Sequence, residues 1–131
     1  MATPKMRLLR GESRRITVDI GAGAVSAGDP VYYSSGLVLA AADGGRIDAV
    51  MVDDGAANAT DQRAELLVDG QVWSFTCSSL TAKQGTALAA AGSGLLDGGT
   101  SADPSIGWVV DADVANTATS GRMVVGRGTI A

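Results

Sequence analysis

Short runs of alternating polar and apolar residues cover most of the chain. Residues 15–20 read Arg-Ile-Thr-Val-Asp-Ile, an alternation that is typical of a half-buried strand. Residues 31–33 and 37–39 are apolar runs on either side of Ser34-Ser35-Gly36, so they predict a hairpin. Further short apolar runs lie at 47–52, 64–68, 71–77, 106–110 and 122–125. Polar loops separate them, and we therefore expect about nine short strands.

The Asp69-Gly70 pair is the strongest hairpin signal in the chain. It predicts that residues 64–68 pair with residues 71–77, with Trp73 and Phe75 on one face of the strand. Residues 78–84 are expected to form a short helical turn that ends at Gly85. The whole pattern predicts an all-β fold, a small Gly-rich β-barrel or sandwich with at most one short helix.

The chain repeats itself with a spacing of 58 or 59 residues. Residues 47–53 (Ile-Asp-Ala-Val-Met-Val-Asp) precede a polar loop that reaches Arg63. Residues 106–111 (Ile-Gly-Trp-Val-Val-Asp) precede a second polar loop that reaches Arg122. One such unit has too few strands to bury its apolar face, so two units are expected to share a core. We place these two similar β units at 25–77 and 80–131.

The charge of the chain is unevenly distributed. The net charge is −4, but residues 1–15 carry +4 and the remainder carries −8. The basic residues at the start are Lys5, Arg7, Arg10, Arg14 and Arg15, against Glu12 alone. We therefore expect residues 1–14 to form an extended basic arm ahead of a single β domain, 15–131. An acidic protein surface is its expected target, because the acidic body repels phosphate; a merely solvated tail is the alternative.

The composition excludes most common catalytic sites. Histidine is absent, so the chain has no Ser-His-Asp or Cys-His catalysis and no His-ligated zinc. The single cysteine, Cys77, lies in an apolar run and is interpreted as a buried structural thiol. We expect no enzyme activity, since an enzyme of this composition would need an Asp or Asp/Lys site. No run of eighteen apolar residues and no secretory signal is present, so we expect synthesis in a cytoplasm and no membrane contact.

Two carboxylate clusters and two tryptophans are the remaining candidates. Asp53, Asp54, Asp111 and Asp113 follow strands at the start of polar loops, where oxygen ligation of calcium is conceivable. Their spacing is not that of a calcium-binding EF-hand, and Asp is common at loop starts because it bonds its own backbone. We therefore expect no metal and no cofactor. Trp73 and Trp108 are interpreted as core or interface anchors.

Residues 26–33, Ser-Ala-Gly-Asp-Pro-Val-Tyr-Tyr, resemble the Gly-Asp-Pro-Val strand of small tailed-phage capsid decoration proteins, also called capsid cement proteins. Residues 37–44 and the strand 47–52 continue the likeness. The polar loop and Asp-Gly turn within 53–70 are also similar to the core of lambdoid head-decoration proteins. The resemblance covers residues 15–130 and leaves out the basic arm.

This resemblance implies a β-tulip-like structural protein of a bacteriophage virion. Such a protein binds the outer surface of the expanded capsid, commonly as a homotrimer, and stabilises the shell by clamping neighbouring capsomers. The implied partner is the major capsid protein, with no direct contact to nucleic acid. We expect the five basic residues of the arm to contact acidic patches on that partner. The alternative is a ligand- or glycan-binding β module of a virion fibre or tail, which the scarcity of aromatic residues argues against.

Overall fold

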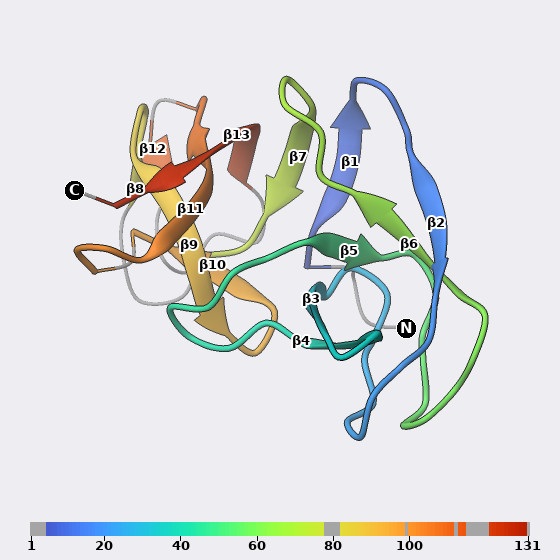
Figure 1. Cartoon of the computed structure of the whole chain (residues 1–131). Coiled ribbons are helices and arrows are strands. Elements are labelled where there is room, and N and C mark those ends of the chain that lie inside the picture. Colours follow the sequence, from blue (N-terminus) through green and yellow to red (C-terminus); the bar gives the residue numbers. More distant parts are fainter. Residues whose placement is uncertain (1–4, 78–81, 99, 112, 115–120, 131) are drawn as a thin grey trace.

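The fold is all-β, as the sequence predicts, in a computed structural model that describes residues 5–77, 82–98, 100–111, 113–114 and 121–130. Within these ranges no helix is present. Two antiparallel sheets pack on each other and do not close into a barrel, so the sandwich alternative holds (Figure 1). The expected helical turn at 78–84 falls partly outside the described residues, and its described part contains strand β8 (Ala82–Lys83).

The first sheet has five strands, and all of its pairings are antiparallel. In spatial order they are β2 (Arg15–Val18), β6 (Gln62–Leu66), β5 (Ala49–Met51), β3 (Pro30–Ser34) and β4 (Leu37–Ala40). The hairpin predicted around Ser34-Ser35-Gly36 is confirmed as β3 and β4.

The second sheet has six strands and takes in the N-terminal segment. In spatial order they are β1 (Arg7–Arg10), β7 (Val72–Phe75), β13 (Gly121–Thr129), β11 (Pro104–Val109), β9 (Ala87–Gly92) and β10 (Leu95–Asp97). A separate two-stranded ribbon pairs β8 with β12 (Asp113–Val114).

The hairpin predicted across Asp69-Gly70 is wrong. Strand β6 pairs with β2 and β5 in the first sheet, whereas β7 pairs with β1 and β13 in the second. The turn therefore carries the chain from one sheet to the other. It is held by backbone hydrogen bonds from Gln71 N–H to Val68 O (3.1 Å) and from Gly70 N–H to Val125 O (3.0 Å).

The two sheets have the same strand order. The order β2-β6-β5-β3-β4 in the first sheet matches β7-β13-β11-β9-β10 in the second, and matching strands lie about 58 residues apart. We call residues 15–70 unit 1 and residues 71–130 unit 2. Because the units are grouped by sheet, β2 belongs to unit 1 and β7 to unit 2. Both units therefore begin earlier in the chain than the expected units 25–77 and 80–131. Strand β1 is an addition at the edge of unit 2.

The match between the units extends to single hydrogen bonds and turns. Parallel bridges join Ile20 to Val38 in unit 1 and Cys77 to Leu96 in unit 2. The hairpin turns Ser35-Gly36 and Ser93-Gly94 both have positive φ, at 52° and 83° and at 54° and 76°. Two successive positive φ values define the tight turn whose twist suits a two-residue hairpin, and glycine adopts them without strain.

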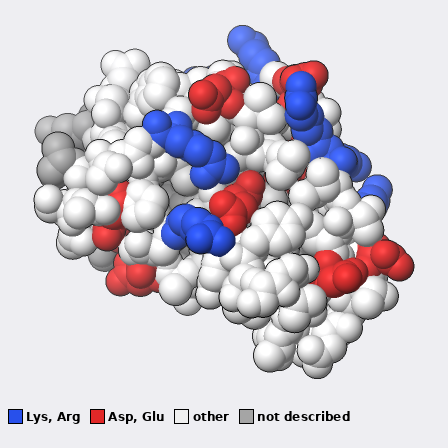
Figure 2. All heavy atoms as spheres, viewed as in Figure 1, with Lys and Arg blue, Asp and Glu red and all other residues white. Residues whose placement is uncertain are grey.

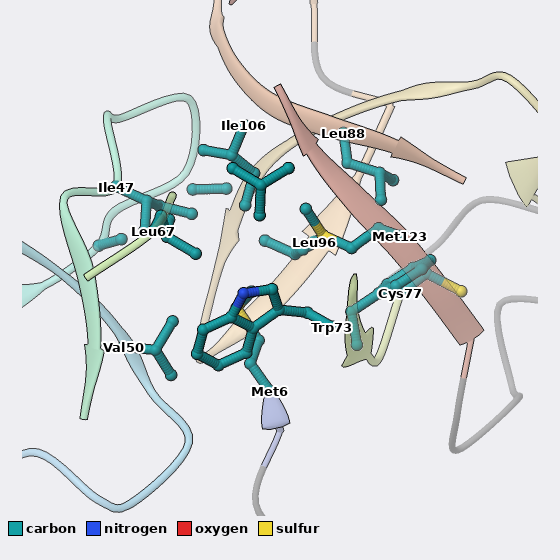
Figure 3. Close-up of a cluster of buried hydrophobic side chains, with 14 of the residues drawn as sticks. Met6, Ile47, Val50, Leu67, Trp73, Cys77, Leu88, Leu96, Ile106 and Met123 are labelled. Atoms are coloured by element: carbon teal, nitrogen blue, oxygen red, sulfur yellow. The ribbon is translucent and has the colours of Figure 1, made fainter. Parts of the chain in front are cut away.

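Each unit buries its own apolar face, and unit 2 also covers part of unit 1. The smaller cluster lies within unit 1: Val18, Ile20, Val25, Val31, Val38, Ala49, Met51 and Ala64. The larger cluster is centred on unit 2 and includes Trp73, Phe75, Leu96 and Met123 (Figure 3). Val50, Ile47 and Leu67 of unit 1 join this larger cluster, so it is the joint between the two units.

Candidate binding surface on the N-terminal strand and the outer sheet face

The basic N-terminal segment is a strand docked on the body. In β1, Arg7 lies opposite Ser74 and Leu8 opposite Trp73. Met6 is 2% exposed and lies beside Trp73 in the larger core cluster (Figure 3). Its N–H donates a hydrogen bond to Gly28 O at 3.0 Å. The alternation of inward Met6 and Leu8 with outward Arg7 is that of an edge strand.

This docking changes the expected arm. Residues 7–10 are extended, but their pairing with β7 holds them against unit 2. The basic charges are therefore presented at the edge of a folded sheet. The first four residues of the expected arm lie outside the described residues.

The connection from β1 to β2 is anchored by the buried carboxylate of Glu65. This side chain is 4% exposed and accepts a hydrogen bond from Ser13 Oγ at 2.8 Å. It also accepts one from the backbone N–H of Arg14, and Arg15 Nε lies 3.5 Å from Glu65 Oε1. A buried carboxylate with this set of donors keeps the connection in one place.

Gln71 provides a second anchor for the same connection. Its Nε2 donates to Glu12 O at 2.6 Å, and its Oε1 accepts from Trp73 Nε1 at 3.0 Å and from Val68 N–H at 2.8 Å. The buried indole N–H of Trp73 is thereby satisfied, and the segment before β2 is tied to the start of unit 2.

The five predicted binding residues differ in how free their charges are. Lys5 lies 3.7 Å from Asp29, Arg14 lies 3.2 Å from Glu12, and Arg15 is paired with Glu65. Among the described residues, Arg7 and Arg10 form no ion pair. Both are exposed and lie on β1, and Figure 2 shows basic side chains gathered over the part of the molecule where β1 and β2 lie. These two arginines are the strongest candidates for contacting an acidic partner.

A groove lies between β1 and the outer face of unit 1. Its volume is about 300 Å3. Met6, Val50 and Trp73 supply apolar lining, and Arg7 and Arg15 supply positive charge. The groove therefore lies beside the basic strand, and its apolar walls Met6, Val50 and Trp73 are each at most 2% exposed.

The outer face of the second sheet carries an apolar row. Trp108 lies opposite Ala87 and Val124, and Val124 lies opposite Val72. Residues directly opposite in an antiparallel sheet share a face, so these four form one row, which Arg10 extends across β1. Trp108 is 45% exposed, whereas Trp73 on the inner face is 2% exposed. The prediction of core or interface anchors thus divides into one core tryptophan and one at the surface.

Trp108 is supported by a glycine on the neighbouring strand. A Cβ added at Gly126 would lie 2.4 Å from Trp108 Cζ3, so the indole ring covers this glycine. The ring therefore lies over Gly126 while the side chain stays largely open to solvent. Aromatic side chains lying over glycine are a known way to stabilise a sheet.

The loop-start aspartates hold arginines of their own units. Arg63 Nη2 lies 2.7 Å from Asp53 Oδ1, and Arg122 Nη2 lies 2.7 Å from Asp111 Oδ1. In both pairs the arginine backbone N–H also donates to the same carboxylate, at 3.1 Å and 2.9 Å. The hydrogen bonds from Arg63 lower the pKa of Asp53 and raise that of Arg63. These two clasps close the polar loops of the two units in the same way.

The other candidates for metal or nucleophilic chemistry have structural surroundings. Asp54 accepts a hydrogen bond from Ala27 N–H at 2.8 Å, and Asp113 lies in β12. Among the described residues, no group of three or more acidic or cysteine side chains is placed to hold a metal ion. Cys77 is buried at 2% exposure, and burial raises the pKa of its thiol. A raised pKa keeps the thiol protonated near neutral pH, which is unfavourable for a nucleophile.

Two features of this surface escape the sequence pattern. The pattern identifies the basic residues but not which of them are paired, because the acidic partners Asp29 and Glu65 are distant in sequence. It also leaves the two tryptophans equivalent. The spacing of the repeat matches Trp108 with Val50, about 58 residues earlier, which is buried at the joint. Only the packing of the folded chain shows that Trp108 is exposed.

A scan against protein-family models finds none that fits this chain, and no curated protein matches its sequence. In the described ranges there is also no helix with the length and apolarity required to cross a membrane.

Proposed function

We propose that this chain is a structural virion protein that binds the outer surface of a bacteriophage capsid and clamps neighbouring capsomers. The resemblance of residues 15–130 to capsid decoration proteins supports this proposal. The partner would be the major capsid protein, and the bound form would be a homotrimer at the capsid surface. The protein would be made in the host cytoplasm and act on the assembled shell.

The observation that carries the proposal is the pair of unpaired arginines on β1. Arg7 and Arg10 are exposed, form no ion pair among the described residues, and sit on a strand fixed by Met6 and by pairing with β7. Ordering such side chains on a rigid strand before binding lowers the entropy that binding costs. An acidic patch on the shell would meet two arginines already in position.

A clamp of this kind gains strength from repetition. One copy needs only a modest interface, because each bound copy stabilises the lattice state that it recognises. Many copies on one shell then act together against internal pressure. An all-β body tied across its two units at Val50, Trp73 and Leu67 suits such a mechanical role.

The proposal is tested by co-sedimentation with expanded, undecorated capsids assembled from the major capsid protein of the same phage. We expect the wild-type protein to bind and the R7Q/R10Q variant to bind more weakly. Roughly tenfold or more is expected, since a hydrogen bond to a charged group contributes about 1.5–3 kcal/mol. The variant should also lose much of the dependence of binding on salt.

The matched control is the R46Q/K83Q variant, which has the same net charge as R7Q/R10Q. Arg46 is paired with Asp48, and Lys83 lies in β8, so neither belongs to β1 or to the contact between the two units. This control should bind like the wild type. Equal weakening of both variants would mean that net charge alone matters, and no binding by the wild-type protein would refute the proposed function.

A further inference from the structure

Comparison of matching positions in the two units identifies two surfaces, each of which is exposed in one unit and buried in the other. In unit 1, the outer row opposite Val50 runs through Pro30 and Glu65 and is buried. The matching row in unit 2 is Ala87, Trp108 and Val124, which is open to solvent at Trp108. The same position in the two sheets is thus a buried contact in unit 1 and a free surface in unit 2.

The reverse holds for three inner-face residues at the rim of each sheet: they are buried in unit 2 and only partly buried in unit 1. Trp73, Ala90 and Val125 are buried at the rim of unit 2, where unit 1 packs. The matching positions in unit 1 are Ile16, Tyr33 and Leu66, which are only partly buried. We call these three residues the unit 1 rim, and we call Ala87, Trp108, Val124 and Val72 the Trp108 face.

Within one chain, the outer face of unit 1 packs on the rim of unit 2 at Val50, while Glu65 of the same row is covered by the β1–β2 connection. The joint contains Val50, Ile47 and Leu67 in one cluster with Trp73, Ala90 and Val125. It is fixed by hydrogen bonds from Gly44 N–H to Ala90 O (2.8 Å) and from Arg127 Nη1 to Ile47 O (2.7 Å). This leaves the chain with one unused face, on unit 2, and one unused rim, on unit 1.

We infer that copies of this chain associate head to tail, with the Trp108 face of one copy on the unit 1 rim of the next. The occupant is a second copy because the chain already makes the equivalent contact internally. The sizes also complement each other: the internal joint combines Val50 on the face with Trp73 on the rim, and the new contact would combine Trp108 with Ile16. In this pair a large residue and a small one have changed places, so the summed volume of the pair changes by only one methylene group.

This contact is heterologous, because the two copies contribute different surfaces. Repeating it generates a closed ring if the rotation between copies allows closure, and an open chain otherwise. The inference goes beyond the homotrimer of the proposed function, because it names the contact between copies and predicts that contact for the free protein, without a capsid.

The test measures association of the purified protein by sedimentation velocity and native mass spectrometry from low to high micromolar concentration. The wild-type protein should associate as the concentration rises. Trp108→Lys and Ile16→Lys should each remain largely monomeric, because each places an ammonium group in an apolar contact. Leu37→Lys is the matched control, since Leu37 is another large apolar residue, 40% exposed and outside both surfaces, and it should behave like the wild type.

Mixing the two monomeric variants gives the decisive result. Each variant keeps one intact surface, so the mixture should form a heterodimer and nothing larger. Circular dichroism verifies that the variants are folded, and Tyr33→Lys replaces Ile16→Lys if the latter is not. A wild-type protein that stays monomeric would overturn the inference. So would association that depends on Trp108 alone, which would indicate a symmetric contact between two Trp108 faces.

Discussion

At the scale of single residues, the two tryptophans show how the fold assigns different tasks to the same side chain. Trp73 alternates with Phe75 on the inner face of β7 and is fully enclosed, with its indole N–H bonded to Gln71. Trp108 lies on the outer face of β11 over Gly126. One stabilises the joint between the units, and the other is available for binding.

The Asp53–Arg63 clasp makes a prediction about acid stability. The pKa of Asp53 is lowered in the folded protein, so its stabilising contribution is present above the unfolded pKa of about 3.9 and is lost as the pH falls through the folded value. Asp53→Asn should therefore be less stable than the wild type at neutral pH, and the difference should shrink below about pH 4. Thermal unfolding of both proteins between neutral and acidic pH measures this.

The control for this clasp is Asp69→Asn in the exposed turn between the units, which should unfold like the wild type at neutral pH. A stability gap between Asp53→Asn and the wild type that stays constant into strong acid would show that the carboxylate charge of Asp53 is not the cause.

Met6 gives a second prediction at this scale. Met6→Ala should lower the free energy of unfolding by about 2–5 kcal/mol, because it removes a buried side chain from the larger core. Leu9→Ala, three residues further along and 42% exposed, should change it by less than about 0.5 kcal/mol. Urea unfolding compares them, and equal small effects would mean that the segment before β2 is not packed on the core.

At the scale of elements, β1 contributes both to the packing of the core and to the proposed binding surface. Leu8 on its inward side and Met6 directly before it pack on the core, and its outward side presents Arg7 and Arg10. A basic arm that was merely attached to the body could be removed without consequence for folding. A strand that completes the edge of a sheet cannot.

Deleting residues 1–11 should therefore destabilise the protein by at least the roughly 2–5 kcal/mol expected for Met6→Ala. The deletion should also shift the fluorescence emission of Trp73 to the red, because the indole loses its cover. The experiment uses a Trp108→Phe background, in which Trp73 is the only tryptophan. An unchanged melting temperature and emission maximum would show that β1 is dispensable.

The strands themselves could be predicted from the alternation of polar and apolar residues, because that alternation records which face of a strand is buried. The hairpin at Ser35-Gly36 could also be predicted, since its turn residues and flanking strands are adjacent in sequence. The hairpin prediction at Asp69-Gly70 is wrong because the residues of a turn do not determine which strands pair. β6 and β7 each find better partners far away in the chain. The candidate site shows the same limit, because pairing with Asp29 and Glu65 decides which basic residues are free.

At the scale of the whole molecule, the protein consists of two matching β units joined face to rim, with one added strand. Strand order, parallel bridges, hairpin turns and Asp–Arg clasps all recur. Strand β1 and the exposure of Trp108 do not recur in unit 1. These differences lie on neighbouring parts of the outer sheet face, which is where we place binding to the shell and to a second copy.

The most direct test of capsid binding is a cryo-electron microscopy reconstruction of the phage particle with and without this chain. We predict extra density on the outer surface of the shell into which the two-unit body fits, with Arg7 and Arg10 of β1 facing the major capsid protein. Density in which β1 faces solvent would contradict the binding surface. A shell with no such density in the presence of the chain would contradict the proposed function.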